Sequence, residues 1–130
     1  MSHHEHPNAT LIRETTEAMY RGDMSAVVNV LADDVEWHEI GRAEPIVGKA
    51  ALAERYGSTP ADYGDFSGHV HDVVANDDHV VALVETTVRR GDRSFTYRTA
   101  EIFHVRDGKI TERWAFAGDT GAINEFFAGF

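Results

Sequence analysis

The sequence contains no cysteine among its 130 residues, and this absence removes several kinds of chemistry at once. Disulfide bonds, thiolate nucleophiles and cysteine-ligated zinc are all excluded. Long apolar runs are also missing and the first ten residues are polar, so we expect neither a membrane span nor a signal peptide. These absences predict a soluble, cytoplasmic protein.

Positive charge is scarce as well. Twelve Lys and Arg residues stand against 22 Asp and Glu residues, which gives a formal net charge of -10. Nucleic acids and anionic membranes are bound by neutralising phosphate with Lys and Arg, so neither is an expected partner. Hydrophobic residues make up 42% and charged residues 26%, a mix typical of one globular domain with a core and room for a pocket.

Helical patterns dominate the N-terminal half. Residues 1–7 are expected to form a loosely held arm, and residues 8–130 a single domain. Asn8 or Thr10 is a candidate N-cap for a first helix that ends at Gly22. The next predicted segments are a helix capped by Asp23 with an apolar stripe at Met24, Val27, Val28 and Leu31, a strand over 35–39, a helix over 49–56 and a loop over 57–65.

Strand patterns dominate the C-terminal half. Segments 66–75, 79–90, 94–105 and 109–117 are rich in Val, Thr and aromatic residues, and turn residues separate them. Asp107-Gly108 is a strong hairpin signal, because both residues tolerate a positive φ. An antiparallel meander is therefore expected, followed by an apolar helix over 123–130. Helices segregated against one antiparallel sheet predict an α+β fold.

Two carboxylates interrupt apolar rows of the predicted strands. Glu39 follows Val35 and Trp37 in one alternating row, and Glu101 lies in the row that contains Phe103. A buried carboxylate is costly unless it is paired or protonated, and two of them facing one cavity would make an acid/base pair. In the alternative interpretation Glu39 lies in water at the end of its strand, and Glu101 pairs with Arg98 or Arg113.

The eight histidines do not predict a metal site. His69 and His71 share a strand face and could ligate a metal, but a third ligand at a predictable spacing is missing. His38, next to Trp37, is a candidate polar group of a pocket. Regular alternation points it away from Glu39, and a bulge at the strand end would bring both inward.

Several apolar and aromatic side chains are candidates for the wall of a substrate pocket, although aromatic residues more often fill a core. No nucleophile elbow, P-loop or dinucleotide-binding motif is present. The expected ligand is a small apolar molecule, and no cofactor or metal is predicted. The pocket residues that we predict are Tyr20, Trp37, His38, Val84, Phe103 and Trp114.

Four stretches of the sequence follow a familiar pattern: AMYRGDMSAVVNVLADDVEWHE, EPIVGKAALAERY, HDVVANDDHVVALVETTV and EIFHVRDGKITERW. Together with the order of elements, they resemble the nuclear transport factor 2-like superfamily, in particular its SnoaL-like and ketosteroid-isomerase-like members. The resemblance covers nearly the whole chain. It implies a cone-shaped, strongly curved antiparallel sheet wrapped around the N-terminal helix, with a deep apolar pocket. It also implies a homodimer formed through the outer face of the sheet.

The resemblance to ketosteroid isomerases implies roles for individual residues. Glu39 falls on the position of the catalytic base, and Glu101 on that of the acid in the oxyanion hole. Thr15 stands where those enzymes have a tyrosine, and it does not replace the acidity of a phenol. Tyr56 matches a supporting tyrosine that could donate a hydrogen bond. The predicted chemistry is cofactor-free proton transfer on an apolar carbonyl compound: isomerisation, cyclisation or aldol-type chemistry.

Two other functions stay open. Arg113 on the inner row of the last strand would join Glu39 and Glu101 in a carboxylate–Arg–carboxylate set similar to that of limonene-epoxide-hydrolase-like enzymes. The row of Trp114 and Phe116 is the more apolar one, and the sequence leaves open which row faces inward. The third possibility is a non-catalytic protein that binds a hydrophobic ligand, which the fold also permits.

Overall fold

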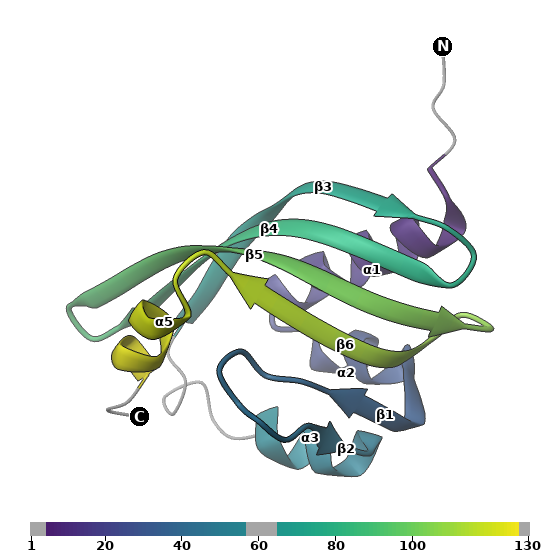
Figure 1. Cartoon of the computed structure of the whole chain (residues 1–130), viewed down its shortest axis with the longest axis horizontal. Coiled ribbons are helices and arrows are strands. Elements are labelled where there is room, and N and C mark those ends of the chain that lie inside the picture. Colours follow the sequence, from purple (N-terminus) through teal and green to yellow (C-terminus); the bar gives the residue numbers. More distant parts are fainter. Residues whose placement is uncertain (1–4, 57–64, 128–130) are drawn as a thin grey trace.

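The computed structural model describes residues 5–56 and 65–127, which form helices packed against a single curved sheet (Figure 1). The loop predicted over 57–65 therefore lies outside the described residues except for Asp65, as do residues 1–4 of the predicted arm. The elements in chain order are α1 (Pro7–Tyr20), α2 (Met24–Asn29), β1 (Leu31–Trp37), β2 (Ile46–Val47), α3 (Lys49–Tyr56), β3 (Asp65–Ala75), β4 (His79–Arg90), β5 (Arg93–Arg106), β6 (Lys109–Ala117) and α5 (Thr120–Phe127).

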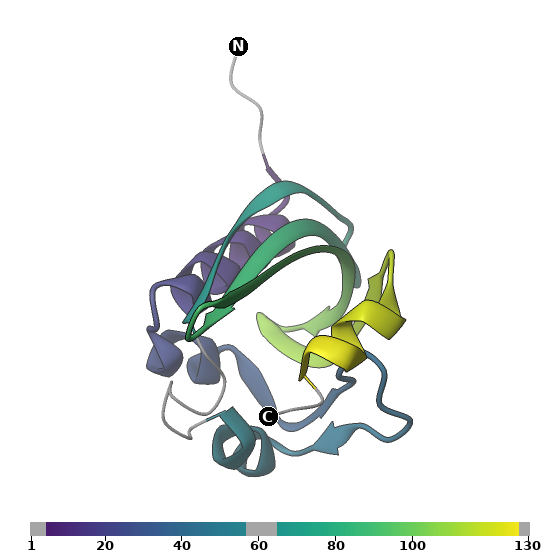
Figure 2. The ribbon, with the colours of Figure 1, turned by 90° about the vertical axis from the view of Figure 1, so that its left-hand side faces the viewer.

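The sheet has six strands in the order β2-β1-β6-β5-β4-β3. Strands β3 to β6 form the predicted antiparallel meander, and β1 joins its free edge by parallel pairing with β6. The sheet curves strongly without closing, and α1 packs against β3 and β4 (Figure 2). The predicted α+β fold with a curved sheet around the N-terminal helix is confirmed.

Short turns set the register of the meander, and the turn between β5 and β6 has two residues. Asp107 and Gly108 have φ values of 52° and 75°, and Arg106 pairs with Lys109 across them. Positive φ at both central residues is the geometry whose twist matches that of the flanking strands, which is why Asp-Gly favours it. The hairpin predicted at this position is confirmed.

The core lies between the concave face of the sheet and the helices. Ile12 of α1 is fully buried against alternate residues of β4, among them Val80 and Val84. Phe103 of β5 and Val35 of β1 belong to the same cluster. The even-numbered residues of β4 and the odd-numbered residues of β5 therefore face inward.

The first helix begins earlier than predicted. His6 is its N-cap: the imidazole Nδ1 accepts a hydrogen bond of 3.0 Å from the backbone N–H of Asn8, and Pro7 occupies the first turn. Asn8, predicted as a cap, lies within the helix and donates through its amide to the carbonyls of Asn76 and Asp77. None of the helices in the described ranges is long and apolar enough to cross a membrane.

The border between α2 and β1 also differs from the prediction. Leu31 was expected to close the helical stripe, but it is the first residue of β1 and pairs with Ile110 of β6. The strand predicted over 35–39 thus starts at Leu31 and ends at Trp37, which leaves Glu39 beyond it. A stripe at helical spacing cannot reveal this, because the parallel pairing that extends the strand comes from a distant segment.

The last helix, α5, begins at Thr120 rather than at Ile123, and Asp119 caps it by accepting a hydrogen bond of 2.9 Å from the N–H of Ala122. Ile123 and Phe126 are buried, and the ring of Phe126 stacks on that of Phe95 with centroids 5.3 Å apart. The prediction that this helix packs on an apolar surface is confirmed.

Candidate functional site

A buried ion pair lies on the concave face of the sheet. Glu101 of β5 is 8% exposed, and its Oε1 lies 3.1 Å from Nη2 of Arg113. Arg113 pairs with Phe103 in the register of β5 and β6, so it shares the inner face with Glu101. The sequence left open which row of residues in the last strand faces inward. In the structure the row of Arg113 is the inner one.

The two members of the ion pair have further partners. Thr99 donates a hydrogen bond of 3.1 Å to Oε2 of Glu101, and Nη1 of Arg113 donates one of 3.0 Å to the carbonyl of His38. The guanidinium carbon lies 4.7 Å from the centroid of the Trp37 ring, a cation–π contact. Nε of Arg113 is buried and has no hydrogen-bond partner among the described residues, so a donor is left over beside Glu101.

Apolar side chains surround the ion pair. The rings of Trp37 and Phe103 meet edge to face with centroids 6.4 Å apart. Val84 is 3% exposed and belongs to the core cluster, against which Tyr20 and Trp37 are partly buried. Of the six predicted pocket residues, Trp37, Val84 and Phe103 thus lie on the inner face of the sheet, and Tyr20 packs against the same core from α1.

Two tyrosines line the same interior. The hydroxyl of Tyr20 lies 2.7 Å from that of Thr86. Burial raises the pKa of Tyr20 and that of Tyr97 to about 12, and the negative charge of Glu101 contributes to both shifts. Both phenols therefore stay protonated at neutral pH and can donate hydrogen bonds. Tyr97 was missed at the sequence level, although it lies in the same alternating row as Glu101.

Glu39 lies beyond the end of β1 and is ion-paired with another residue. Its Oε1 is 3.4 Å from Nε of Arg55, on α3, and its side chain is 20% exposed. Among the described residues, the ion pairs link Glu101 to Arg113 and Glu39 to Arg55, with none between Glu39 and Arg113. The two carboxylates predicted to work together therefore have separate Arg partners.

Two predicted pocket residues lie on the other face of the sheet. The indole of Trp114 is stacked on the imidazole of His38, with centroids 3.6 Å apart and planes 9° apart, and Trp114 is 37% exposed. The prediction that they line the interior needs correction, because strand alternation directs Trp114 away from Arg113. His38 contributes to the inner face through its backbone carbonyl alone among its described contacts.

Three other residues considered in the sequence analysis, Thr15, Tyr56 and Arg98, have no described contact with the ion pair. The hydroxyl of Thr15 donates to the carbonyl of Leu11 within its own helix, at 2.6 Å. Tyr56 is the last residue of α3, and its side chain lies outside the described part of the structure. Arg98, an alternative partner for Glu101, forms an ion pair of 3.0 Å with Glu85 on the outer face.

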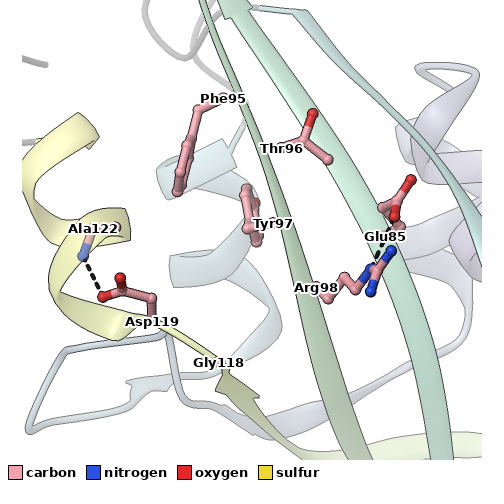
Figure 3. Close-up of a pocket in the computed structure, with 8 residues that line it drawn as sticks. All are labelled: Glu85, Phe95, Thr96, Tyr97, Arg98, Gly118, Asp119 and Ala122. Atoms are coloured by element: carbon pink, nitrogen blue, oxygen red, sulfur yellow. Dashed lines mark hydrogen bonds and ion pairs between the residues drawn. The ribbon is translucent and has the colours of Figure 1, made fainter.

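A groove of about 440 Å³ follows the part of β5 that β6 leaves unpaired (Figure 3). Figure 3 shows Phe95 and Tyr97 directed toward α5, whereas Arg98 meets Glu85 on the opposite side of the strand. Tyr97 lines this groove and also lies in the same alternating row of β5 as Glu101. Its lining residues are Glu85, Phe95, Thr96, Tyr97, Arg98, Gly118, Asp119 and Ala122.

Comparisons with known proteins agree with this architecture. The sequence model of a family described as SnoaL-like domain matches residues 12–113. An uncharacterised protein of Mycobacterium tuberculosis is 29% identical over an alignment that covers 91% of this chain and 94% of the relative.

Solved structures show the same fold. Bal32a, from a soil-derived mobile gene cassette, has a TM-score of 0.82 and 24% identity over 92% of this chain and 95% of its own. IdmH of Streptomyces antibioticus, named as a candidate polyketide cyclase, has a TM-score of 0.72 and 22% identity, covering 93% of this chain and 99% of its own.

Proposed function

Because this chain belongs to the SnoaL-like domain family, we propose that it is a small-molecule enzyme that transfers a proton within an apolar carbonyl substrate without a cofactor. The observation that carries the proposal is the ion pair of Glu101 and Arg113, buried among Trp37, Phe103 and two protonated tyrosines. Charged side chains are rarely buried in a core, and a buried pair next to unused donors is typical of a site that handles developing charge.

The contacts favour Glu101 as the general base. Its two carboxylate oxygens accept hydrogen bonds from Thr99 and Arg113, so Glu101 acts here as an acceptor rather than as the donor that the family resemblance implied. In the proposed reaction the carboxylate takes a proton from the carbon next to the carbonyl. It returns that proton to a second carbon, which restores the starting charge and completes an isomerisation.

Negative charge develops on the carbonyl oxygen of the substrate when the proton leaves, and hydrogen-bond donors are needed to stabilise it. The Arg113 guanidinium has an unused Nε–H, and the phenol of Tyr97 keeps its proton. Donors fixed in a water-poor interior stabilise an enolate more strongly than they would in water. The resemblance to a candidate polyketide cyclase favours a substrate with several carbonyl groups as the one that fills the apolar interior.

Deuterium incorporation in D₂O, followed by NMR over a panel of apolar ketones and polycarbonyl compounds, tests this proposal. Proton removal next to a carbonyl exchanges hydrogen for deuterium even when no net product forms. We expect Glu101→Gln to slow exchange by about 100-fold or more, since a positioned general base contributes 10²–10⁴-fold. Glu14→Gln, which changes an exposed carboxylate of α1, is the matched control and should exchange as the parent protein does.

Glu39→Gln decides between the two carboxylates. Exchange that persists in Glu101→Gln and is lost in Glu39→Gln would give the role of base to Glu39, as the family resemblance implied. Loss in Glu101→Gln alone would leave Glu39 with a role in positioning Arg55, its ion-pair partner.

Two alternatives have their own tests. Epoxide hydrolysis needs both carboxylates on one Arg, and the Arg113–Glu101 pair supplies half of that set. Turnover of apolar epoxides that disappears with either Glu39→Gln or Glu101→Gln would favour this function. Ketones that raise the melting temperature without exchange, equally in the Glu101→Gln variant, would favour a non-catalytic hydrophobic-ligand-binding protein.

A further inference from the structure

We propose that the outer face of the sheet carries a zinc site formed by Glu36, His38 and Glu112. This inference concerns the face opposite the proposed active site and does not depend on its chemistry. Glu36 pairs with Glu112 in the parallel register of β1 and β6, and His38 follows Glu36 at the spacing that returns to the same face. The carboxylate oxygens and imidazole nitrogens of the three residues all lie within 4.8 Å of one another.

The two carboxylates repel each other in this arrangement. Like charges directly opposite one another on neighbouring strands are destabilising. Within the described ranges no Lys or Arg forms an ion pair with Glu36 or Glu112. The side chains nearest to the carboxylate of Glu112 at ion-pair distance are those of His38 and His104, each with an N–O distance of 4.0 Å. A bound divalent cation would offset this repulsion and convert the two carboxylates into ligands.

The imidazole of His38 is held in place with its Nε2 unused. The ring is stacked on Trp114, and its side chain is 15% exposed. Nε2 is buried, has no hydrogen-bond partner among the described residues, and lies 4.0 Å from Oε1 of Glu112. A buried nitrogen without a partner is costly, and a metal ion at this point would satisfy it.

The surroundings fix the second ligand as well. The indole N–H of Trp114 donates to Oε1 of Glu112, and the backbone N–H of His38 donates to the carbonyl of Arg113 at 2.9 Å. One aromatic side chain therefore orients both the imidazole and the carboxylate. Outer partners of this kind are a regular feature of metal sites, since they fix the direction of the ligand lone pairs.

A candidate fourth ligand lies beside Glu112. His104 of β5 lies directly across from Glu112, and its Nδ1 is 4.0 Å from Oε2 of Glu112. The centroid of the His104 ring is 4.6 Å from that of the His79 ring. Imidazole nitrogens combined with carboxylate oxygens suit zinc, whereas calcium and magnesium prefer oxygen ligands throughout. Ligand atoms around tetrahedral zinc are separated by about 3.4 Å. The ligand atoms of Glu36, His38 and Glu112, which lie within 4.8 Å of one another, would therefore have to approach by up to about 1.4 Å.

Isothermal titration with zinc chloride tests the proposal. His3, His4 and His6 near the N-terminus offer a competing set of imidazoles, so the parent for the titration is the full chain with His3→Ala and His4→Ala. We expect this parent to bind one zinc ion per chain, and either His38→Gln or Glu112→Gln to weaken the affinity by at least about tenfold, the usual effect of losing one ligand or its orienting partner. His71→Ala, which removes an exposed histidine of β3, should leave the affinity unchanged.

Melting temperatures distinguish a variant that has lost zinc affinity from one that has lost its fold. Zinc that binds the folded chain raises its melting temperature, so the parent should melt higher with zinc, and the gain should be smaller for the His38→Gln and Glu112→Gln variants. Glu36→Gln changes an exposed residue and serves as a variant whose folding is least affected. Unchanged zinc affinity in His38→Gln, Glu112→Gln and Glu36→Gln, or the absence of zinc binding by the parent, would overturn the proposal.

Discussion

At the scale of single residues, two Arg–Glu ion pairs of similar length differ in how far they are buried. Nη2 of Arg113 lies 3.1 Å from Glu101, and their side chains are 12% and 11% exposed. Nε of Arg98 lies 3.0 Å from Glu85, and those side chains are 86% and 33% exposed. Solvent screens the second pair, whereas the first exchanges hydration for a few protein partners.

Removal of Arg113 and removal of Arg98 should therefore change the free energy of unfolding by very different amounts. We expect Arg113→Ala to lower the free energy of unfolding by about 3–5 kcal/mol, because Glu101 would be left as an unpaired buried charge. Arg98→Ala should change it by less than about 1 kcal/mol. Urea denaturation of both variants measures the difference, and equal losses would contradict the assignment of Arg113 to a desolvated interior.

The residues of the site were predictable to different extents. Glu101 could be found from the sequence, because a carboxylate in an alternating apolar row is a local pattern. The inward direction of Arg113 could not, since the neighbouring row with Trp114 and Phe116 is more apolar and still faces outward. Which face is inner depends on where α1 packs, and that is a tertiary property. The proximity of His104 and Glu112 was missed for the same reason, as cross-strand register brings them together.

At the scale of secondary-structure elements, α1 and β3 are joined by a close approach. The ring of Tyr20 lies over Gly68, and a Cβ built on Gly68 would lie 2.9 Å from Cζ of Tyr20 and would also overlap the carbonyl of Glu85. The absence of a side chain at Gly68 is what allows the end of α1 to reach the sheet. It also brings the Tyr20 hydroxyl to Thr86, on the adjacent strand.

Gly68→Ala should therefore destabilise the protein by about 1–3 kcal/mol, the usual cost of overpacking. Gly118→Ala is the matched control, because a Cβ at Gly118 meets nothing within 4 Å. Thermal unfolding of the two variants compares them. A loss for Gly118→Ala as large as that for Gly68→Ala would show that the contact with Tyr20 and Glu85 is not the cause.

Most elements were predictable because their signals are local. The turns after β3, β4 and β5 are encoded by short Asn, Asp and Gly segments, so the four long strands lie within about two residues of their predicted bounds. The predicted bounds are wrong where a contact with a residue far away in the sequence determines the local structure. Leu31 fits the stripe of α2 but pairs with Ile110, and His6 replaces Asn8 as a cap while its Nε2 bonds to Asp77 at 2.9 Å.

At the scale of the whole molecule, the outer face of the sheet exposes apolar side chains in two neighbouring cross-strand rows. Leu83, Ala100 and Phe116 lie in one row, with Leu83 41% and Phe116 57% exposed. The other row contains Val74, Val81, Ile102 and Trp114. Contiguous apolar patches of this kind are unusual on monomers and mark interaction surfaces.

We propose that a second copy of the chain covers these two rows and forms a homodimer. Light scattering coupled to gel filtration should give twice the mass of the chain. Phe116→Glu should reduce it to the mass of a monomer, because the substitution places a charge in the contact. Arg98→Glu, on the same face but outside the two rows, is the control. A parent protein of monomeric mass would contradict the proposal.

The parallel pairing of β1 with β6 also bears on the order in which the strands can pair during folding. During synthesis on a ribosome β1 is made long before β6, so its parallel partner does not yet exist when β1 emerges. The β3–β6 meander needs only short turns, whereas pairing Leu31 with Ile110 closes most of the chain into a loop. We therefore expect the contacts of Trp37 and the carbonyl of His38 with Arg113 to form after the meander has formed.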